Sequence, residues 1–457
     1  MDTLKSNGRI IDAFRKEIKK TFSMSKTSTV PGLAYLAARE KPKTAANFLN
    51  ARRQIDGAEG LWRIGNKLYD LETFAKSHPG GTEWIRLTKG TDITELFESH
   101  HLTDKAERLL PKFYVRDAAT SRSVPLTFLS DGFYRTFKRR AVEALRSVDF
   151  HRSSTTTNLI TDSLMVTTFA LSLASAFTNS HAIAVFAGIF LTWTTNAAHN
   201  FFHMRDNFRM YYYDLSLLSS KNWRIAHVMS HHMYPNTLWD YEIYVLEPFI
   251  QWIPRKDKSF FAGIISKIIS PIVWMLLFIA EGFKRILKIL IISRYYSVFK
   301  EYGVFEFRDI VPLLLPLSMS LLAPKILVAL KLWLIMVLLS SALFGLIGFN
   351  AAHHHPDIFH DGDIYRNDLD WGLLEMDSVR DREVIDDSLF LALTNYGSHT
   401  LHHLLPTVDH HYLELCVPAF LQTCKEFGLN SDKWTQWELI KGQFRQLART
   451  ETKENHR

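Results

Sequence analysis

Two pairs of long apolar segments restrict the folds open to this chain. The run Leu159–Thr178 contains a single charged residue, Asp162, and only Asn179-Ser180-His181 separates it from a second apolar run at 182–198. A helix of about 20 apolar residues crosses the hydrocarbon core of a bilayer. Because the connection is so short, the two helices must be antiparallel neighbours. We therefore predict a membrane-spanning helical hairpin.

A second hairpin is predicted later in the chain. Its arms are Ile310–Ala323 and Ile326–Phe349. Between the hairpins, Phe260–Ser293 is apolar but carries five charged side chains, which favours a helix lying in the membrane interface. Lys and Arg concentrate in residues 204–258 and towards both termini, so the positive-inside rule places both termini and the long loops in the cytosol. The prediction is an all-α membrane domain with four transmembrane helices and a cytosolic cap.

Changes in composition divide the chain into five regions. Residues 1–41 are predicted to be a flexible N-terminal tail, 42–116 a small soluble domain, and 117–149 a linker that begins with small polar residues. Residues 150–430 form the membrane domain, and 431–457 are predicted to be a C-terminal cytosolic tail. The fold class is therefore multidomain.

Charge and cysteine content exclude several classes of function. The net charge of +7 is spread along the chain, which argues against a nucleic-acid partner. The two cysteines, Cys416 and Cys424, are too few for a four-thiolate zinc site and are expected to be free thiols. The sequence has no Gly-rich dinucleotide motif, so a nicotinamide cofactor would have to be bound by another protein.

The soluble domain contains a histidine at a tight turn, in His78-Pro79-Gly80-Gly81. Proline fixes one backbone angle and paired glycines allow the turn, so His78 can stand rigidly over a planar ring. His101 follows after a mixed apolar segment, with His100 as the competing second ligand. Together with Trp62 and the LYDLETF segment, these motifs make residues 42–116 resemble the cytochrome b5 family. The resemblance implies a small α+β domain that binds haem b through His78 and His101 and only transfers electrons.

Three clusters of histidines lie in or beside the membrane domain: HNFFH at 199–203, HVMSHH at 227–232 and HTLHH at 399–403. Residues four apart share one face of a helix. This spacing pairs the first and last histidines of HNFFH and of HTLHH, and the first two of HVMSHH. Eight imidazoles in a nearly dry region are costly unless they bind metal, and eight are enough for two ions. Because a haem electron donor lies on the same chain, we expect two non-haem iron ions.

The three clusters resemble the histidine boxes of membrane fatty acid desaturases, over residues 150–430. A cytochrome b5 domain fused before them resembles the front-end desaturases and the insect cytochrome b5-related proteins. The resemblance implies a di-iron centre and no catalytic residue separate from the metal ligands. The implied ligands are His199, His203, His227, His231, His232, His399, His402 and His403.

A further iron ligand is expected from the run of three histidines after the last span. The resemblance favours His354 as the ligand and Asn350 as its support, with His353 and His355 as open alternatives. Two positions depart from the usual family pattern. The first box has Asn200 where many desaturases have Asp, and the third box opens with His399 where front-end desaturases usually have Gln.

The resemblance implies an O2-dependent oxidoreductase of the endoplasmic reticulum membrane that acts on lipid acyl chains. Its electrons would come from NAD(P)H through a separate cytochrome b5 reductase and then the haem domain. The open alternatives are a hydroxylase built on the same iron site and a non-catalytic membrane haem electron carrier. Asp240 and Glu242, which follow the second box, are either supports for its histidines or ordinary loop charges.

Overall fold

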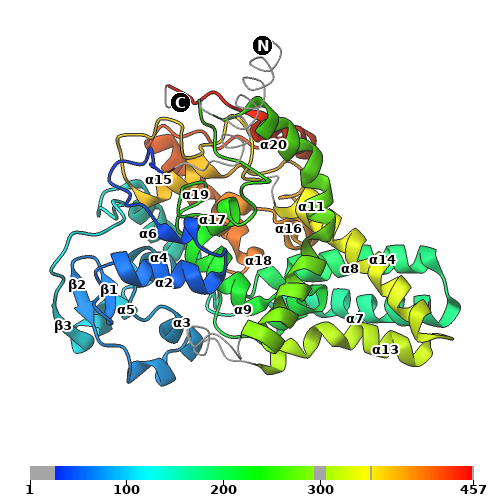
Figure 1. The fold of residues 1–457 in the computed structure, drawn as a ribbon. Coiled ribbons are helices and arrows are strands. Elements are labelled where there is room, and N and C mark those ends of the chain that lie inside the picture. Colours follow the sequence, from blue (N-terminus) through cyan, green and yellow to red (C-terminus); the bar gives the residue numbers. More distant parts are fainter. Residues whose placement is uncertain (1–25, 257, 293–304, 350–351, 455–457) are drawn as a thin grey trace, which may run out of the picture.

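The computed structural model describes residues 26–256, 258–292, 305–349 and 352–454. A small domain with a three-stranded sheet lies at one side of the molecule, and helices of the membrane domain extend from the opposite side (Figure 1). The fold class predicted from the sequence, a small α+β domain followed by a largely helical domain, is confirmed.

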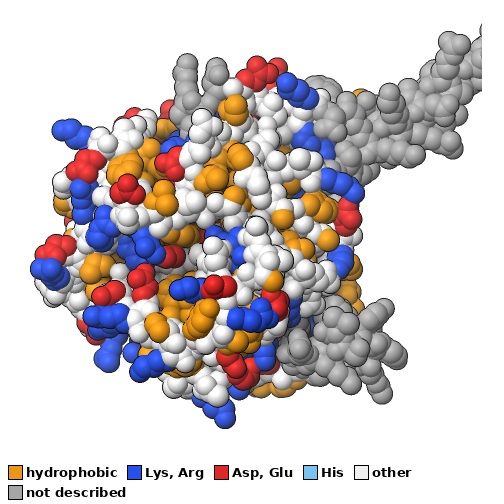
Figure 2. Space-filling view, turned by 90° about the vertical axis from the view of Figure 1, so that its left-hand side faces the viewer, with side chains coloured by type: hydrophobic (Ala, Val, Ile, Leu, Met, Phe, Trp, Pro, Cys, Tyr) orange, Lys and Arg blue, Asp and Glu red, His pale blue; other side chains and the backbone are white. Residues whose placement is uncertain are grey.

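The small domain is built around a short antiparallel sheet in the order β1-β2-β3. Trp62 fixes the sheet to the helical layer, because its indole N–H donates to the Ile85 carbonyl at 2.9 Å. Basic and acidic side chains are interspersed on this side of the molecule (Figure 2). The elements are α2 (Ala45–Ile55), β1 (Trp62–Ile64), β2 (Lys67–Tyr69), α3 (Thr82–Leu87), α4 (Thr94–His100), α5 (Lys105–Leu109) and β3 (Tyr114–Asp117).

The predicted first hairpin consists of α7 (Thr155–Thr178) and α8 (His181–His199). Asn179, in the left-handed conformation, ends α7, and the Ser180 hydroxyl accepts from the Ile183 amide to begin α8. This turn uses the residue types that tolerate positive φ and cap helices. The second hairpin pairs α13 (Leu314–Leu322) with α14 (Ile326–Leu343), and the four helices lie side by side (Figure 1).

The count of four membrane spans is not confirmed. Among the described residues, three helices are long and apolar enough to cross a membrane: α7, α11 (Phe260–Leu287) and α14. Helix α13 has nine residues, which at about 1.5 Å per residue is less than half of a bilayer core. Helix α11, predicted to lie in the interface, has 28 residues and is one of the three.

The outer faces of these helices carry an exposed apolar belt. Isolated exposed apolar residues are normal, but a patch this wide on adjacent helices marks contact with lipid or another apolar partner. Its members include Leu159, Val166, Phe177, Val185, Phe186, Ile264, Ile268, Ile272, Leu276, Leu317, Leu321, Leu327, Leu330 and Leu334. The belt supports a membrane location for this part of the chain.

Shorter helices form a cap over one end of the bundle (Figure 1). Within the described residues, the cap contains a π-helical segment, Arg224–His231. Its other helices are α9 (Ser220–Trp223), α10 (Tyr241–Tyr244), α15 (Trp371–Ser378), α16 (Leu389–Asn395), α17 (His399–Leu404), α18 (His410–Leu413), α19 (Val417–Glu426) and α20 (Gln436–Ala448).

The regions predicted as a linker and a C-terminal tail are packed instead. Residues 117–149 contain α6 (Phe133–Ala144), whose Phe133 and Phe137 are fully buried and which contacts α19. In the C-terminal region, α20 packs on α11 and buries Leu439 and Leu447. Both regions carry an apolar stripe at helical spacing, so burial stabilises them as part of the fold.

The described part of the predicted N-terminal tail, residues 26–41, is also packed. Asp361 accepts hydrogen bonds from the Ser28 hydroxyl at 2.6 Å and the Thr29 amide at 2.7 Å. Arg39 forms a buried ion pair with Glu247 at 2.8 Å. Residues 1–25 of the predicted tail lie outside the described residues.

Replacing Arg39 with alanine is expected to lower the free energy of unfolding by about 3–5 kcal/mol, because Glu247 then stays buried without its partner. The matched control is Lys26→Ala, which breaks the exposed ion pair between Lys26 and Glu40 and should leave stability unchanged. Thermal unfolding of the detergent-purified variants measures both. Equal stability of Arg39→Ala and wild type would show that residues 26–41 do not anchor the fold.

Candidate functional site

The first site is a cavity of about 510 Å³ in the small domain. His78 and His101 face each other across it with ring centroids 6.2 Å apart. Two imidazole nitrogens that each lie about 2 Å from a shared metal put the ring centres about 6 Å apart, so the pair fits a bis-histidine haem. Both Nδ1 atoms contact backbone carbonyls, of Gly81 and Phe97, which leaves both Nε2 atoms for the iron.

The two glycines after His78 are required by the geometry of the cavity. A Cβ on Gly80 would lie 2.9 Å from Cε1 of His78, too close for the ring to keep its position. Gly81 has φ +113°, and a Cβ there would overlap the Asp206 carboxylate. The motif therefore both positions the haem ligand and lets the second domain approach closely.

The second site is a buried cluster of nine histidines in the cap. Ring nitrogens of five of them lie within 4.8 Å of one another, and so do those of a group of three. His399 joins the group of three, because its Nε2 lies 2.7 Å from that of His353. The first group is His199, His203, His227, His232 and His402, and the second is His231, His353, His399 and His403.

The ring nitrogens of this cluster face one another, as those of histidines around a shared metal ion do. Nε2 atoms face one another at 2.6 Å between His199 and His227, and at 3.1 Å between His231 and His353. Both ring nitrogens of His203 and of His402 are buried and have no hydrogen-bond partner among the described residues. Buried polar atoms without a partner are costly, and a metal ion would supply one for the unprotonated nitrogen of each ring. The donor set of two adjoining groups of imidazoles therefore fits two iron ions.

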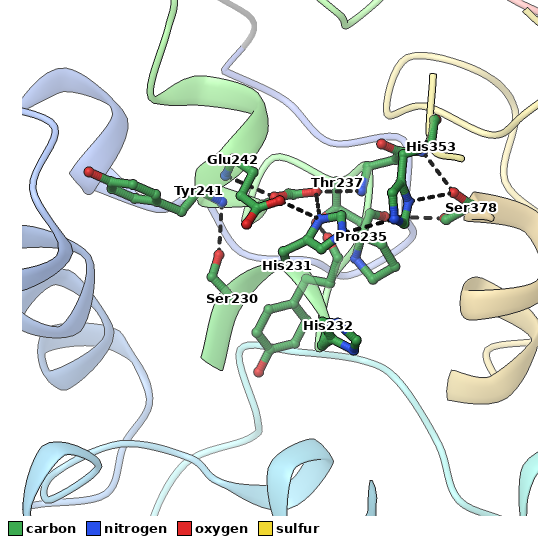
Figure 3. A network of polar contacts seen from close by, with 12 residues as sticks. Ser230, His231, His232, Pro235, Thr237, Tyr241, Glu242, His353 and Ser378 are labelled. Carbon is green, nitrogen blue, oxygen red and sulfur yellow. Dashed lines mark hydrogen bonds and ion pairs between the residues drawn. The ribbon is translucent and has the colours of Figure 1, made fainter. Parts of the chain in front are cut away.

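The outer nitrogens of these rings are held by carboxylates and a carbonyl. Nδ1 of His231 lies 2.8 Å from Asp240, and Nδ1 of His353 lies 3.0 Å from the Ser378 carbonyl (Figure 3). Nδ1 of His227 lies 2.8 Å from Glu242. A partner on Nδ1 fixes the tautomer and turns Nε2 towards the metal. Of the two interpretations left open for Asp240 and Glu242, the structure therefore favours support of the second box.

Local helix geometry decides which group each ring joins. In the π-helical second box, the His232 amide donates to the His227 carbonyl five residues earlier, and both rings enter the first group. The predicted pairing of His227 with His231 is also present, because the two rings stack with centroids 5.2 Å apart. In α17, His402 and His403 are 100° apart around the helix axis at about 3.6 residues per turn. They therefore enter different groups.

Burial and nearby carboxylates set the charge states in the cap. Burial opposes the charged form of His231, but Asp240 and Glu242 outweigh it and raise the pKa of this imidazole to about 9. Burial raises the pKa of Glu242 to about 8, although His231 lowers it. Burial also raises the pKa of the Glu375 carboxyl well above its usual value and lowers the pKa of His403. A cation on the inner nitrogens would favour the carboxylate forms of both acids.

The structure corrects the expected ninth ligand. His353, rather than His354, reaches the cluster. His354 stacks on Trp252 with ring centroids 3.7 Å apart, and its Nδ1 lies 3.0 Å from Nε2 of His360. His355 contacts the Arg445 guanidinium at 2.6 Å instead. The expected support, Asn350, lies outside the described residues.

Two contacts at the cluster were not predicted from the sequence. Glu375 accepts at 2.7 Å from Nδ1 of His403, and both residues are fully buried. Asn200 accepts at 2.7 Å from Nδ1 of His410, whose ring stacks on His402 with centroids 4.7 Å apart. The amide at the position where Asp is usual thus holds a histidine that packs on a ligand.

Glu375→Gln is expected to weaken iron binding by about 10–100-fold, because the amide no longer supplies the negative charge that makes His403 a stronger ligand. Competition with a chelator measures the affinity. Glu383→Gln is the control, because Glu383 is an exposed glutamate that precedes α16, as Glu375 does. Unchanged affinity in Glu375→Gln would show that this carboxylate has no part in iron binding.

A cavity for haem and a two-ion histidine cluster on one chain, with an apolar belt beside them, define a membrane-associated redox protein. Comparison with known proteins agrees. The family model described as fatty acid desaturase matches residues 179–433, more than half of the chain. The model described as cytochrome b5-like heme/steroid binding domain matches residues 50–119. No solved structure matches the chain.

Several curated relatives cover one or both domains. "Cytochrome b5-related protein" of Drosophila melanogaster is 40% identical over 412 residues, 89% of this chain and 92% of that protein. "Acyl-lipid (8-3)-desaturase" of Mortierella alpina is 24% identical over 407 residues, 80% of this chain and 87% of that protein. "Nitrate reductase (NADH) 2" of Nicotiana tabacum is 40% identical over 70 residues, 15% of this chain and 8% of that protein.

The chain belongs to the fatty acid desaturase family and carries a cytochrome b5-like domain before its desaturase domain. It is a membrane oxidoreductase whose cofactors are haem and a di-iron centre.

Proposed function

We propose that this protein desaturates lipid acyl chains. One hydrogen leaves each of two adjacent methylenes to form a double bond, while O2 takes up these two hydrogens, two electrons from NAD(P)H and two protons and is reduced to two molecules of water. The observation that carries the proposal is the convergence of nine buried imidazoles into two groups, beside a bis-histidine cavity on the same chain. Two irons fed by a haem suit the activation of O2 rather than hydrolysis.

The electrons are proposed to come from a separate NAD(P)H-dependent cytochrome b5 reductase. The lack of a dinucleotide-binding motif in the sequence supports a second protein. The likeness of the small domain to part of a nitrate reductase named for NADH supports a nicotinamide source. Electrons would enter at the haem domain and pass on to the di-iron centre.

The residues of the chain prepare the cluster for iron. When bound, iron supplies the O2 chemistry that no side chain offers. The nine imidazoles would hold the ions, while Glu242, Asp240 and Glu375 hold the Nδ1 protons of His227, His231 and His403. All nine rings are buried, so bulk water is kept from the oxidising centre.

The protein is proposed to lie in the endoplasmic reticulum membrane with both termini in the cytosol. The apolar belt on α7, α8, α11, α13 and α14 supports membrane insertion. The Lys and Arg residues concentrated in 204–258 support a cytosolic cap, where a soluble reductase domain can reach the haem.

Metal content and lipid products test the proposal together. The purified protein should contain about three irons per haem, one in the haem and two in the cluster. Cells expressing it should form an acyl product that lacks two hydrogens, and His402→Ala should abolish the product while leaving the haem spectrum intact. His411→Ala, an exposed neighbour, is the control. A product that gains one oxygen would indicate a hydroxylase. One iron per haem and no product would indicate an electron carrier.

A further inference from the structure

The haem cavity reaches the di-iron cluster across the domain boundary. His203, Met204 and Arg205, which follow α8, line the same cavity as His78 and His101. His203 belongs to the first metal-binding group, and its ring lies 4.1 Å from that of His232 and 4.8 Å from that of His402 between centroids. The two redox sites therefore lie against each other rather than at opposite sides of the molecule.

His100 lies between the two sites. It is bonded through the backbone to the haem ligand His101, and its ring lies 6.0 Å from that of His203 between centroids, with the planes 33° apart. The His100 ring also packs against Trp84, with ring centroids 5.3 Å apart. Nδ1 of His100 contacts the Ser99 hydroxyl at 2.9 Å, whereas its buried Nε2 has no hydrogen-bond partner among the described residues. Hydrogen bonding thus engages one of the two ring nitrogens and leaves the other without a partner.

The helix that ends at His100 is fixed to the desaturase domain. The Lys138 ammonium donates to the Glu98 carbonyl at 2.7 Å, and Arg135 pairs with the Glu98 carboxylate. On the same helix, Glu95 accepts from the Tyr234 hydroxyl at 3.1 Å. These contacts come from α6 and from the segment that follows the second histidine box. They fix the helix that ends at His100 against the rest of the chain.

The loop that carries His78 is fixed as well. The Asp206 amide donates to the Gly80 carbonyl at 3.2 Å. Glu83 pairs with Arg224 at 2.8 Å and with Arg308 at 2.9 Å. Arg224 also lies over the Trp84 ring at 4.5 Å from its centroid. Both histidines of the haem pair are therefore anchored to the same partner surface.

We propose that His100 is the bridge through which electrons pass from the haem to the di-iron centre, a role that rests on the proposed function. Electron transfer falls off steeply with distance and is faster through bonds and ring contacts than through open space. His100 supplies one covalent connection, to His101, and one ring contact, to His203. Each transfer oxidises the haem iron from the ferrous to the ferric state and reduces one iron of the centre from ferric to ferrous. Two transfers, each from a haem reduced again by the reductase, prepare the centre for O2.

Stopped-flow spectroscopy of the full chain tests the bridge. The haem is reduced through the reductase without O2, and its return to the ferric state reports transfer to the di-iron centre. His100→Leu removes the ring, and the rate should fall by about tenfold or more. His100→Phe keeps a ring and should stay near the wild-type rate. His411→Leu, at an exposed position, is the control. The haem spectrum, its midpoint potential and the iron content should be unchanged in all variants.

Other outcomes would overturn the proposal. A wild-type rate in His100→Leu would mean that electrons pass directly from the cavity to His203. Equal slowing in His100→Leu and His100→Phe would mean that packing of the domains matters and the ring does not. If His100→Leu does not load haem, His100→Gln serves as the variant without a ring. Failure of the proposed function is distinguishable, because the wild-type protein would then contain no non-haem iron and its haem would stay reduced.

Discussion

His353→Ala is expected to reduce the iron content from about three to about two atoms per haem and to bring product formation to background. The imidazole of His353 lies between two others of the second group, with its Nε2 at 2.7 Å from His399 and 3.1 Å from His231. Its Nδ1 is held by the Ser378 carbonyl. Removing this ring leaves the second ion with too few nitrogens to bind firmly.

His354→Ala is the matched control for this experiment, because it changes the adjacent residue and the same side-chain type. His354 stacks on Trp252 and contacts His360, away from the cluster. We expect this variant to keep all its iron and its activity, with at most a loss of thermal stability. Elemental analysis together with haem absorbance measures the ratio. The reverse pattern, with iron lost only in His354→Ala, would restore the assignment made from the sequence.

His78→Ala is expected to abolish haem binding and, with it, product formation driven by NAD(P)H and the reductase. His78 is one of the two histidines that face each other across the cavity, and its Nδ1 is already engaged by the Gly81 carbonyl. With one axial ligand missing, the apolar cavity cannot hold a six-coordinate haem. The nine cluster histidines are untouched, so about two non-haem irons per chain should remain.

The absorption spectrum and the non-haem iron content of the purified variant measure these effects. Lys76→Ala, at an exposed position two residues earlier, should bind haem as the wild type does. A bis-histidine spectrum that survives in His78→Ala would show that His78 is not an axial ligand.

Short-range patterns made much of both sites predictable. The His-Pro-Gly-Gly turn and the HNFFH, HVMSHH and HTLHH clusters encode their own geometry, because a turn or a helical period places the side chains. The run at 353–355 has no such period, since three consecutive residues point in different directions and only the tertiary fold selects His353. Glu375 lies far from every box in the sequence, and no local signal links it to His403.

The packed linker shows a signal that composition concealed. Residues 133–144 are rich in Arg and Lys, yet Phe133, Phe137 and Ala141 recur at four-residue spacing and are all fully buried. Periodicity was therefore the better guide there than polarity. The number of spans could not be settled by apolar runs alone, because α11 tolerates its charges and α13 ends after nine residues.

The paired arginines that hold Glu83 bear on how such a fusion can be re-engineered. Arg224 begins the helical segment that carries the second histidine box, and Arg308 lies on a segment before the second hairpin, yet both pair with one carboxylate of the small domain. A donor domain transplanted from another enzyme would bring its own side chain to this position. Chimeras that retain Glu83 and Trp84 would preserve these contacts between the domains. Replacing the whole small domain without retaining these two residues would remove the contacts. The two halves of this chain are thus constrained to change together.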